Sequence, residues 1–267
     1  SGVPGVGKST FIESFGLNLI NKDHKVAVLA IDPSSPKGGG SILADKTRME
    51  FLSRDPRVFI RPSPTRGSWG GVTARTREAI ILLESAGFDT IIIETVGVGQ
   101  SEYVISDMID YFLLLIQPGA GDEVQGIKKG IIELADFIII NKADGATKSL
   151  AKIAEINYMN AVRIIGKDGK PHVMSISSIV PQGIDELITK IFELNKTEKN
   201  IFNTRRKNQN LKWFDTQINE QLRIIFFKKE GVFEKINELR ESIKNEHIPV
   251  PVAINEGISA LKTLISK

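Results

Sequence analysis

The chain contains no cysteine in 267 residues and only three histidines, His24, His172 and His247, which stand far apart. Without cysteine there are no disulfides, thiolate zinc sites, iron–sulfur clusters or cysteine nucleophiles. Scattered histidines exclude a histidine-rich metal tract. No apolar run approaches the roughly 20 residues that a membrane-spanning helix needs, so we expect no membrane partner. What remains is an ordinary globular composition, 41% hydrophobic and 25% charged.

A large excess of one charge is also missing. The chain has 35 basic and 32 acidic residues, a net charge of +3. The basic excess lies mainly between Lys196 and Glu230, which hold nine basic and four acidic residues. A basic segment can bind nucleic acid. A solvated helical face is the simpler interpretation here, so we expect no nucleic-acid partner.

Short apolar segments alternate with helical patterns along most of the chain. Six of them predict buried strands, at residues 26–32, 57–62, 88–94, 111–117, 136–141 and 172–177. Strands alternating with helices predict an α/β fold with a mostly parallel sheet that is flanked by helices. Ligands bind at the carboxyl ends of such strands.

Helical patterns fill the rest of the chain. Two helices are expected at 9–21 and 73–86, and a third at 253–265, after a break at Pro249 and Pro251. Because no strand pattern follows Ser177, we divide the chain into an α/β domain, residues 1–197, and a helical extension, residues 198–267.

The chain opens on a phosphate-binding motif. Its residues Gly2, Val3, Pro4, Gly5, Val6, Gly7, Lys8 and Ser9 match G-x-x-x-x-G-K-[ST] at every position, and Thr10 follows. Glycines let backbone N–H groups point at phosphate oxygens, and the next helix directs its positive end toward the same anion. Lys8 would reach the outer phosphates and the Ser9 hydroxyl a Mg²⁺ ion.

A guanine-reading pattern follows the fifth predicted strand. Asn141, Lys142 and Asp144 form N-K-x-D, in which the carboxylate accepts from the ring N–H and the exocyclic amine of guanine. Adenine would leave that carboxylate unpaired, which is a costly mismatch. The sixth strand leads into Ser177, Ser178 and Ile179. We expect these residues to close over guanine through their backbone N–H groups; the alternative is a plain turn.

Asp32, Asp45 and Glu94 are the candidate carboxylates for Mg²⁺, which proteins hold with one or two carboxylates plus phosphate oxygens and water. Asp32 and Glu94 each end a predicted strand. The stretch Glu94-Thr95-Val96-Gly97 has the shape of a D-x-x-G switch with glutamate in place of aspartate. The alternative is that these acids only cap the loops that follow them.

The motifs do not identify a glutamine that would orient the attacking water or an arginine that would stabilise the transition state of nucleotide hydrolysis. We predict that Lys8 and Mg²⁺ neutralise charge on the γ-phosphate and that Asp32 orients the attacking water. Gln100 is the nearest glutamine, and Arg66 and the segment around Lys128 are candidates for a cation. A cation supplied there can be worth about 10³–10⁵ in rate.

The motifs as a set resemble the MeaB/MMAA (ArgK-type) family. The resemblance rests on GVPGVGKST, IDPSSPKGGGSILADKTRM, PSPTRGSWGG, ETVGVGQSE, QPGAGDEVQGIKKGI and NKADG, with a weaker match in the arm at Arg205, Arg206, Gln209 and Trp213. It implies a SIMIBI-class P-loop GTPase that forms a homodimer through its C-terminal arm. It also implies GTP or GDP with Mg²⁺ as ligands, and adenosylcobalamin-dependent methylmalonyl-CoA mutase as the partner whose cofactor loading it protects.

Family roles carry over onto matching residues. Lys8, Asp32 and Glu94 match catalytic residues, while Ser9, Asp32, Asp45 and Glu94 match the Mg²⁺ site. Gln125 and Lys128 match the segment that transmits nucleotide state to the mutase. The resemblance further implies helices and a first strand before residue 1. It places the protein in the bacterial cytoplasm, or in the mitochondrial matrix of a eukaryote.

Other functions remain open from sequence. One is a kinase or ATPase linked to lysine, arginine and ornithine transport, an older description of the family. Others are a nucleotide-gated scaffold, a metal-insertion GTPase, and a chaperone of another acyl-CoA mutase. In the arm, Trp213, Ile218, Leu222 and Phe226 either pack on their own domain or form a dimer face.

Overall fold

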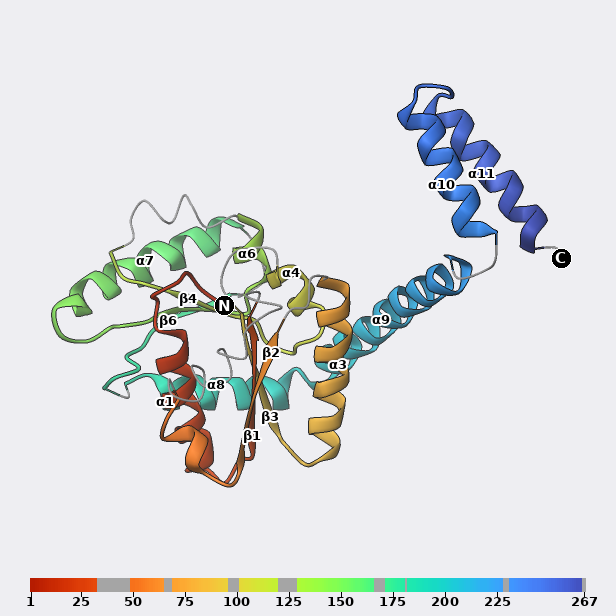
Figure 1. Cartoon of the computed structure of the whole chain (residues 1–267). Helices are drawn as coiled ribbons and strands as arrows, with labels where there is room; N and C mark the ends of the chain where they lie inside the picture. The colour runs from red at the N-terminus through yellow and green to blue at the C-terminus, as the bar shows by residue number, and fades with distance from the viewer. Residues whose placement is uncertain are drawn as a thin grey trace. The chain divides into compact units, whose positions relative to one another are not determined.

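The computed structural model describes residues 1–32, 49–64, 69–95, 101–119, 129–165, 171–180, 182–227 and 231–265. They form two compact units, Ser1–Arg206 and Lys207–Lys267. The first unit contains the strands together with the phosphate-binding and N-K-x-D motifs, and the second is helical (Figure 1).

Six parallel strands form the middle layer of the first unit. Two three-stranded sheets have the orders β2-β1-β3 and β4-β5-β6. The strands are β1 (Val26–Asp32), β2 (Val58–Pro64), β3 (Thr90–Glu94), β4 (Leu113–Ile116), β5 (Phe137–Ile140) and β6 (His172–Ser175). The predicted parallel α/β fold is confirmed. Its strands are uninterrupted apolar runs because helices cover the sheets on both faces.

Helices cover both faces of these sheets. They are α1 (Lys8–Ile20), α3 (Trp69–Ser85), α4 (Ser101–Ser106), α6 (Lys129–Leu134), α7 (Lys148–Ile165) and α8 (Ile184–Thr197), with short 3₁₀ helices η1 (Leu52–Arg54) and η2 (Gly145–Thr147). Helix α3 starts four residues before the predicted Thr73. Gly70 and Gly71, which are poor helix formers, conceal its first turn in the sequence.

Alternating side chains divide the core into faces. Val28 of β1 and Ile139 of β5 pack with α1 and α8 in one cluster. Leu29 packs against α3 on the opposite face, and Ile138 joins the cluster that includes α7 residues. The two sheets therefore share a layer of helices on one face, which holds them together around the phosphate loop.

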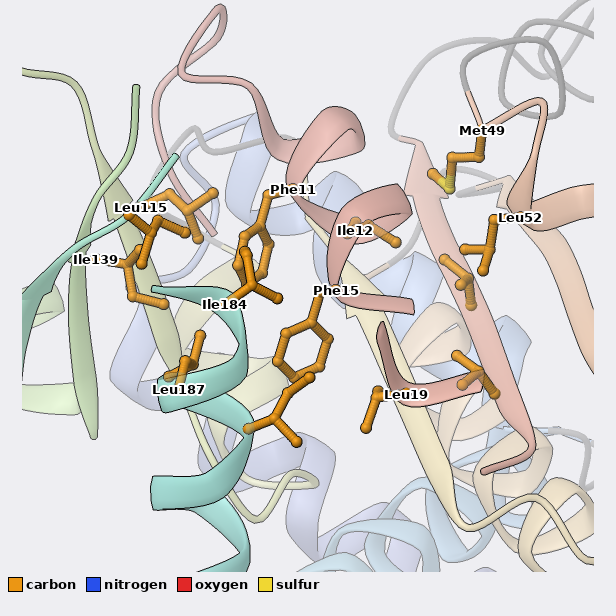
Figure 2. Packing of buried hydrophobic residues seen from close by; sticks show 14 of the residues in the cluster. Phe11, Ile12, Phe15, Leu19, Met49, Leu52, Leu115, Ile139, Ile184 and Leu187 are labelled. Atoms are coloured by element: carbon orange, nitrogen blue, oxygen red, sulfur yellow. The ribbon is translucent and has the colours of Figure 1, made fainter. Parts of the chain in front are cut away.

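Helix α1 is the central element of the shared layer (Figure 2). Phe11 and Phe15 stack with ring centroids 5.3 Å apart, and both belong to the cluster that includes Ile184 and Leu187 of α8. Leu52 of η1 lies close to Gly16: a Cβ added to Gly16 would lie 2.8 Å from the methyl groups of Leu52. The helix that follows the phosphate loop is thus fixed by packing along its length.

The first two residues continue into the second sheet. Ser1 accepts a 2.8 Å hydrogen bond from the Leu115 N–H through its carbonyl oxygen, and Gly2 forms a parallel bridge with Leu115. A Cβ on Gly2 would lie 2.5 Å from the Leu115 carbonyl oxygen. The phosphate loop therefore leaves the sheet beside β4, where only glycine fits.

Helix α9 (Lys199–Phe227) contributes its first turns to the first unit. There Arg205 forms an ion pair with the buried Asp136, 3.1 Å apart, and Arg206 pairs with Asp110 and with Glu84 of α3. The hydrogen bonds to Asp110 raise the pKa of Arg206 above its ordinary value. These contacts fix the start of α9 to the α/β layer.

The second unit continues with α10 (Val232–Lys244) and α11 (Val250–Ile265), which pack on each other through Leu239 and Gly257. Pro251 lies in the first turn of α11, so the expected break before residue 253 is wrong. Proline is tolerated there because first-turn N–H groups have no helical partner. No helix in the described part of the chain is both long and apolar enough to span a bilayer.

We expect Phe15→Ala to lower the free energy of unfolding by about 3–5 kcal/mol, because it leaves a cavity between α1 and α8. Phe51→Ala is the matched control: Phe51 is 66% exposed, whereas Phe15 is 7% exposed. The control should change stability by no more than about 0.5 kcal/mol. Urea unfolding measures both, and equal effects would contradict the packing described for α1.

Candidate functional site

The phosphate loop is shaped by its last glycine. Gly7 is the N-cap of α1 with φ +92°, a left-handed conformation that favours glycine. A Cβ at Gly7 would lie 2.8 Å from the Asn141 side-chain nitrogen. Asn141 itself donates a 2.9 Å hydrogen bond to the Val6 carbonyl. The loop is therefore fixed directly against the N-K-x-D segment.

Lys8 lies inside the loop that precedes it. Its ammonium group donates to the Gly2 carbonyl at 2.7 Å and to the Val3 carbonyl at 3.2 Å. Partial burial lowers its pKa from the ordinary value, and the nearby carboxylates of Glu94 and Glu102 act in the opposite direction. A cation in this position is well placed to meet the charge of a bound phosphate.

A hydroxyl and a carboxylate meet at the start of α1. Ser9 donates a hydrogen bond of 3.2 Å to Glu94, which ends β3. In the register of the sheet Glu94 lies opposite Ala30, and Asp32 follows two residues later on β1. The backbone thus places Asp32 and Glu94 at the same edge. The side chain of Asp32, and all of Asp45, lie outside the described residues.

Lys142 links the base-reading segment to the phosphate loop. It donates to the Gly5 carbonyl at 2.7 Å and to Gln117 at 3.3 Å. Its backbone has φ +59°, which is uncommon for a residue other than glycine and concentrates at functional sites. The sequence did not single out Gln117, although its place at the end of a strand was the available signal.

Two serine hydroxyls form hydrogen bonds with side chains of the N-K-x-D segment. Ser177 donates to the Asp144 carboxylate, and Ser178 donates to the Asn141 side-chain oxygen at 2.7 Å. The Ser177 N–H donates to the Gln182 carbonyl at 3.0 Å, and the Ile179 N–H donates to the Ser177 hydroxyl at 3.3 Å. The N–H groups of Ser177 and Ile179 are thus bonded within their own loop, and the closing of residues 177–179 over guanine stays a prediction.

Glu102 of α4 is a carboxylate that the sequence analysis missed. It is 1% exposed and accepts hydrogen bonds from the Ser1 hydroxyl at 2.8 Å and the Thr95 hydroxyl at 3.4 Å. A buried carboxylate needs such partners. The only signal in the sequence was that Glu102 is an acidic residue a short distance after the Glu94 motif.

Several other residues predicted for the site lie outside the described part of the chain, namely Arg66, Gly97, Gln100, Gln125 and Lys128.

The parallel α/β fold, a phosphate loop that caps α1, and an N-K-x-D segment held against that loop define a P-loop GTPase. Comparison with known proteins then identifies the particular family. A sequence profile described as "Methylmalonyl Co-A mutase-associated GTPase MeaB" matches residues 1–230. The chain belongs to the MeaB family, as the resemblance in its motifs predicted.

Individual relatives agree with this assignment. A putative GTPase from Caulobacter vibrioides is 47% identical over 265 residues, which cover 97% of this chain and 81% of that protein. A mouse protein named "Methylmalonic aciduria type A homolog, mitochondrial" is 45% identical over 241 residues, 88% of this chain and 58% of its own length. The chain thus spans less than two thirds of the mouse relative.

A solved structure extends the likeness to three dimensions. It is described as an LAO/AO transport system kinase, is 34% identical, and matches with a TM-score of 0.71. The match covers 100% of this chain and 80% of that one. The fold derived from the apolar strands is therefore shared with this relative over the whole chain.

We expect Asp144→Asn to weaken GTP binding by roughly 10- to 100-fold, because a hydrogen bond to a charged group contributes about 1.5–3 kcal/mol. The amide can instead donate to the carbonyl of xanthine, so xanthosine triphosphate should become the better ligand. Fluorescent-nucleotide titration measures both affinities. Asp185→Asn, which only breaks an exposed pair with Lys22, is the control. An unchanged preference for GTP would contradict the base site.

Proposed function

We propose that this protein is a GTP-hydrolysing switch that associates with adenosylcobalamin-dependent methylmalonyl-CoA mutase and gates the loading of its cofactor. One observation carries the proposal: two contacts meet at the phosphate loop of a chain that belongs to the MeaB family. Ser9 pairs with Glu94, and Asn141 bonds to Val6. The first contact serves phosphate chemistry and the second serves base recognition. We place the protein in the bacterial cytoplasm, or in the mitochondrial matrix of a eukaryote.

In this proposal residues Gly2 to Thr10 bind the phosphates of GTP. Lys8 now bonds to two loop carbonyls, and it would exchange part of this bonding for the phosphate oxygens when nucleotide enters. Because Lys8 is partly desolvated, its charge is less screened than at the surface and acts more strongly on the γ-phosphate. This positioned charge is the protein's main contribution to the loose transition state of phosphoryl transfer.

The donor set beside Lys8 fits a Mg²⁺ ion. The Ser9 hydroxyl and the Glu94 carboxylate already lie 3.2 Å apart, and Mg²⁺ prefers such hard oxygen ligands. We propose Ser9 and Glu94, with Asp32 and Asp45, as the residues that would hold it. When bound, the ion supplies positive charge that neutralises the phosphate oxygens. We assign the orientation of the attacking water to Asp32.

Guanine selectivity is assigned to Asp144, with Asn141 and Lys142 as its support. The Ser177 hydroxyl donates a hydrogen bond to the Asp144 carboxylate. This bond limits the rotation of the Asp144 side chain toward a wrong base. Of the three residues predicted to close over guanine, the backbone N–H of Ser178 is the one we assign to the base. The rejection of adenine then follows from the unpaired carboxylate it would leave.

The mutase partner is inferred from the family. The matching family description names a mutase-associated GTPase, and the mouse relative carries the name of methylmalonic aciduria. We propose that Gln125 and Lys128 transmit nucleotide state to the mutase. Residues 198–267 would form the dimerisation arm. Its apolar side chains support that role, since several are exposed on α9, namely Leu211, Phe214, Ile218, Leu222 and Ile225.

Glu94→Gln should lower kcat for GTP hydrolysis by about 10²-fold, because it removes a carboxylate that would hold the Mg²⁺ ion whose charge neutralises the γ-phosphate. The concentration of Mg²⁺ needed for half-maximal rate should rise, while GDP affinity measured in EDTA should change little. Glu84→Gln is the matched control, since Glu84 only pairs with Arg206 at the surface. Phosphate-release assays across a Mg²⁺ titration provide the measurement, and a rate like that of wild type would refute the role of Glu94.

Methylmalonyl-CoA mutase from the same source should raise GTP turnover by at least about 10-fold, if the partner completes the site as cations do in other GTPases. The assay compares GTP hydrolysis with and without the mutase, and with bovine serum albumin as the protein control. Intact GTP binding without stimulation would count against the mutase. Transfer of labelled phosphate to a protein or metabolite would instead favour the transport-linked kinase.

A further inference from the structure

Helix α4 is the first described element after the Glu94 motif, and α6 is the first after the segment that holds Gln125 and Lys128. The two helices contact each other. Nothing in the sequence predicts this contact, because Tyr103 and Gly130 are 27 positions apart.

The contact is formed by an aromatic ring against a glycine. A Cβ added to Gly130 would overlap the Tyr103 hydroxyl and would lie 3.1 Å from the ring carbon that carries it. Tyr103 is nevertheless 46% exposed, so the ring is not needed to fill the core. Gly130 is the second residue of α6, and alanine forms helices more readily than glycine does. The absence of a side chain at Gly130 thus lets α6 approach the ring closely.

The neighbouring residue of α4, Glu102, lies beside the phosphate site. Glu102 is almost fully buried and bonds to Ser1 at the start of the phosphate loop and to Thr95, which directly follows Glu94. Ile105 and Met108 pack against Ile31 at the end of β1. One short helix therefore touches the phosphate loop on one side and α6 on another.

We propose that the first turn of α4 is the mechanical connection between the nucleotide site and α6, with Glu102 as the contact to the phosphate loop and Tyr103–Gly130 as the contact to α6. This inference rests on the proposed function insofar as the signal is meant for the mutase. Glu102 and Tyr103 are adjacent in one helical turn, so a displacement at one moves the other. A rigid secondary element packed between two sites can carry coupling of this kind.

Tyr103→Ala and Gly130→Ala test the contact from its two sides. Each should leave basal GTP hydrolysis within about 2-fold of wild type but reduce stimulation by the mutase about 5-fold or more, in the usual range of coupling between sites. Because alanine raises the helix propensity of α6, a loss in Gly130→Ala cannot be attributed to a weaker helix. The double variant should be no worse than Tyr103→Ala, since both remove one interaction.

Hydrogen exchange gives a readout that does not depend on the mutase. In the wild-type chain the amides of residues 129–134 should exchange at different rates with GDP and with a non-hydrolysable GTP analogue, and this difference should disappear in both single variants. Leu82→Ala, an exposed residue of α3, is the control and should retain it.

The outcomes separate this inference from the proposed function. Equal exchange of α6 in the two nucleotide states of the wild type, or variants that keep the full difference, would overturn the connection. A wild type that the mutase fails to stimulate, with an exchange difference that still depends on Tyr103 and Gly130, would refute the mutase as partner and leave the connection standing.

Discussion

Strand β1 is buried from Val26 to Ile31, because α1 covers one of its faces and α3 and α4 the other. Parallel strands joined by helical crossovers are the usual arrangement of a sheet that is buried on both faces. All carboxyl ends then meet at one edge, and residues distant in sequence are brought together there. Asp32, Glu94 and Asn141 share that edge for this reason alone.

One cation and two carboxylates gather at this edge. Lys8 and the carboxylates Glu94 and Glu102 lie close enough to influence one another. Glu102 is the buried member of this group, and removing Lys8 would leave its carboxylate with less compensation.

Sequence was sufficient for much of the fold. Apolar runs located all six strands within two residues at either end, since burial on two faces requires nearly continuous hydrophobicity. Helix ends were harder: Gly70 and Gly71 hid the start of α3, and Pro251 looked like a break although it lies in a first turn. Local propensity decides little when tertiary packing stabilises the helix.

For the site, sequence identified the motif residues but not the side chains that hold them. The hydroxyls of Ser177 and Ser178, the amide of Gln117 and the carboxylate of Glu102 act through neighbours between 7 and 101 positions away. No periodicity records such pairs. The Tyr103–Gly130 contact belongs to the same category, because a glycine that is required by a distant ring looks like any other glycine in a sequence.

The bond from Asn141 to Val6 joins residues 135 positions apart. It has a consequence for folding as well as for binding. A nucleotide that occupies this site needs both the opening loop and a segment from beyond the middle of the chain, so it binds the assembled unit and not the unfolded chain. By mass action such a ligand stabilises the native state by about 2.7 kcal/mol at a hundredfold excess over Kd. A guanine nucleotide bound there would therefore contribute to the stability of the folded unit.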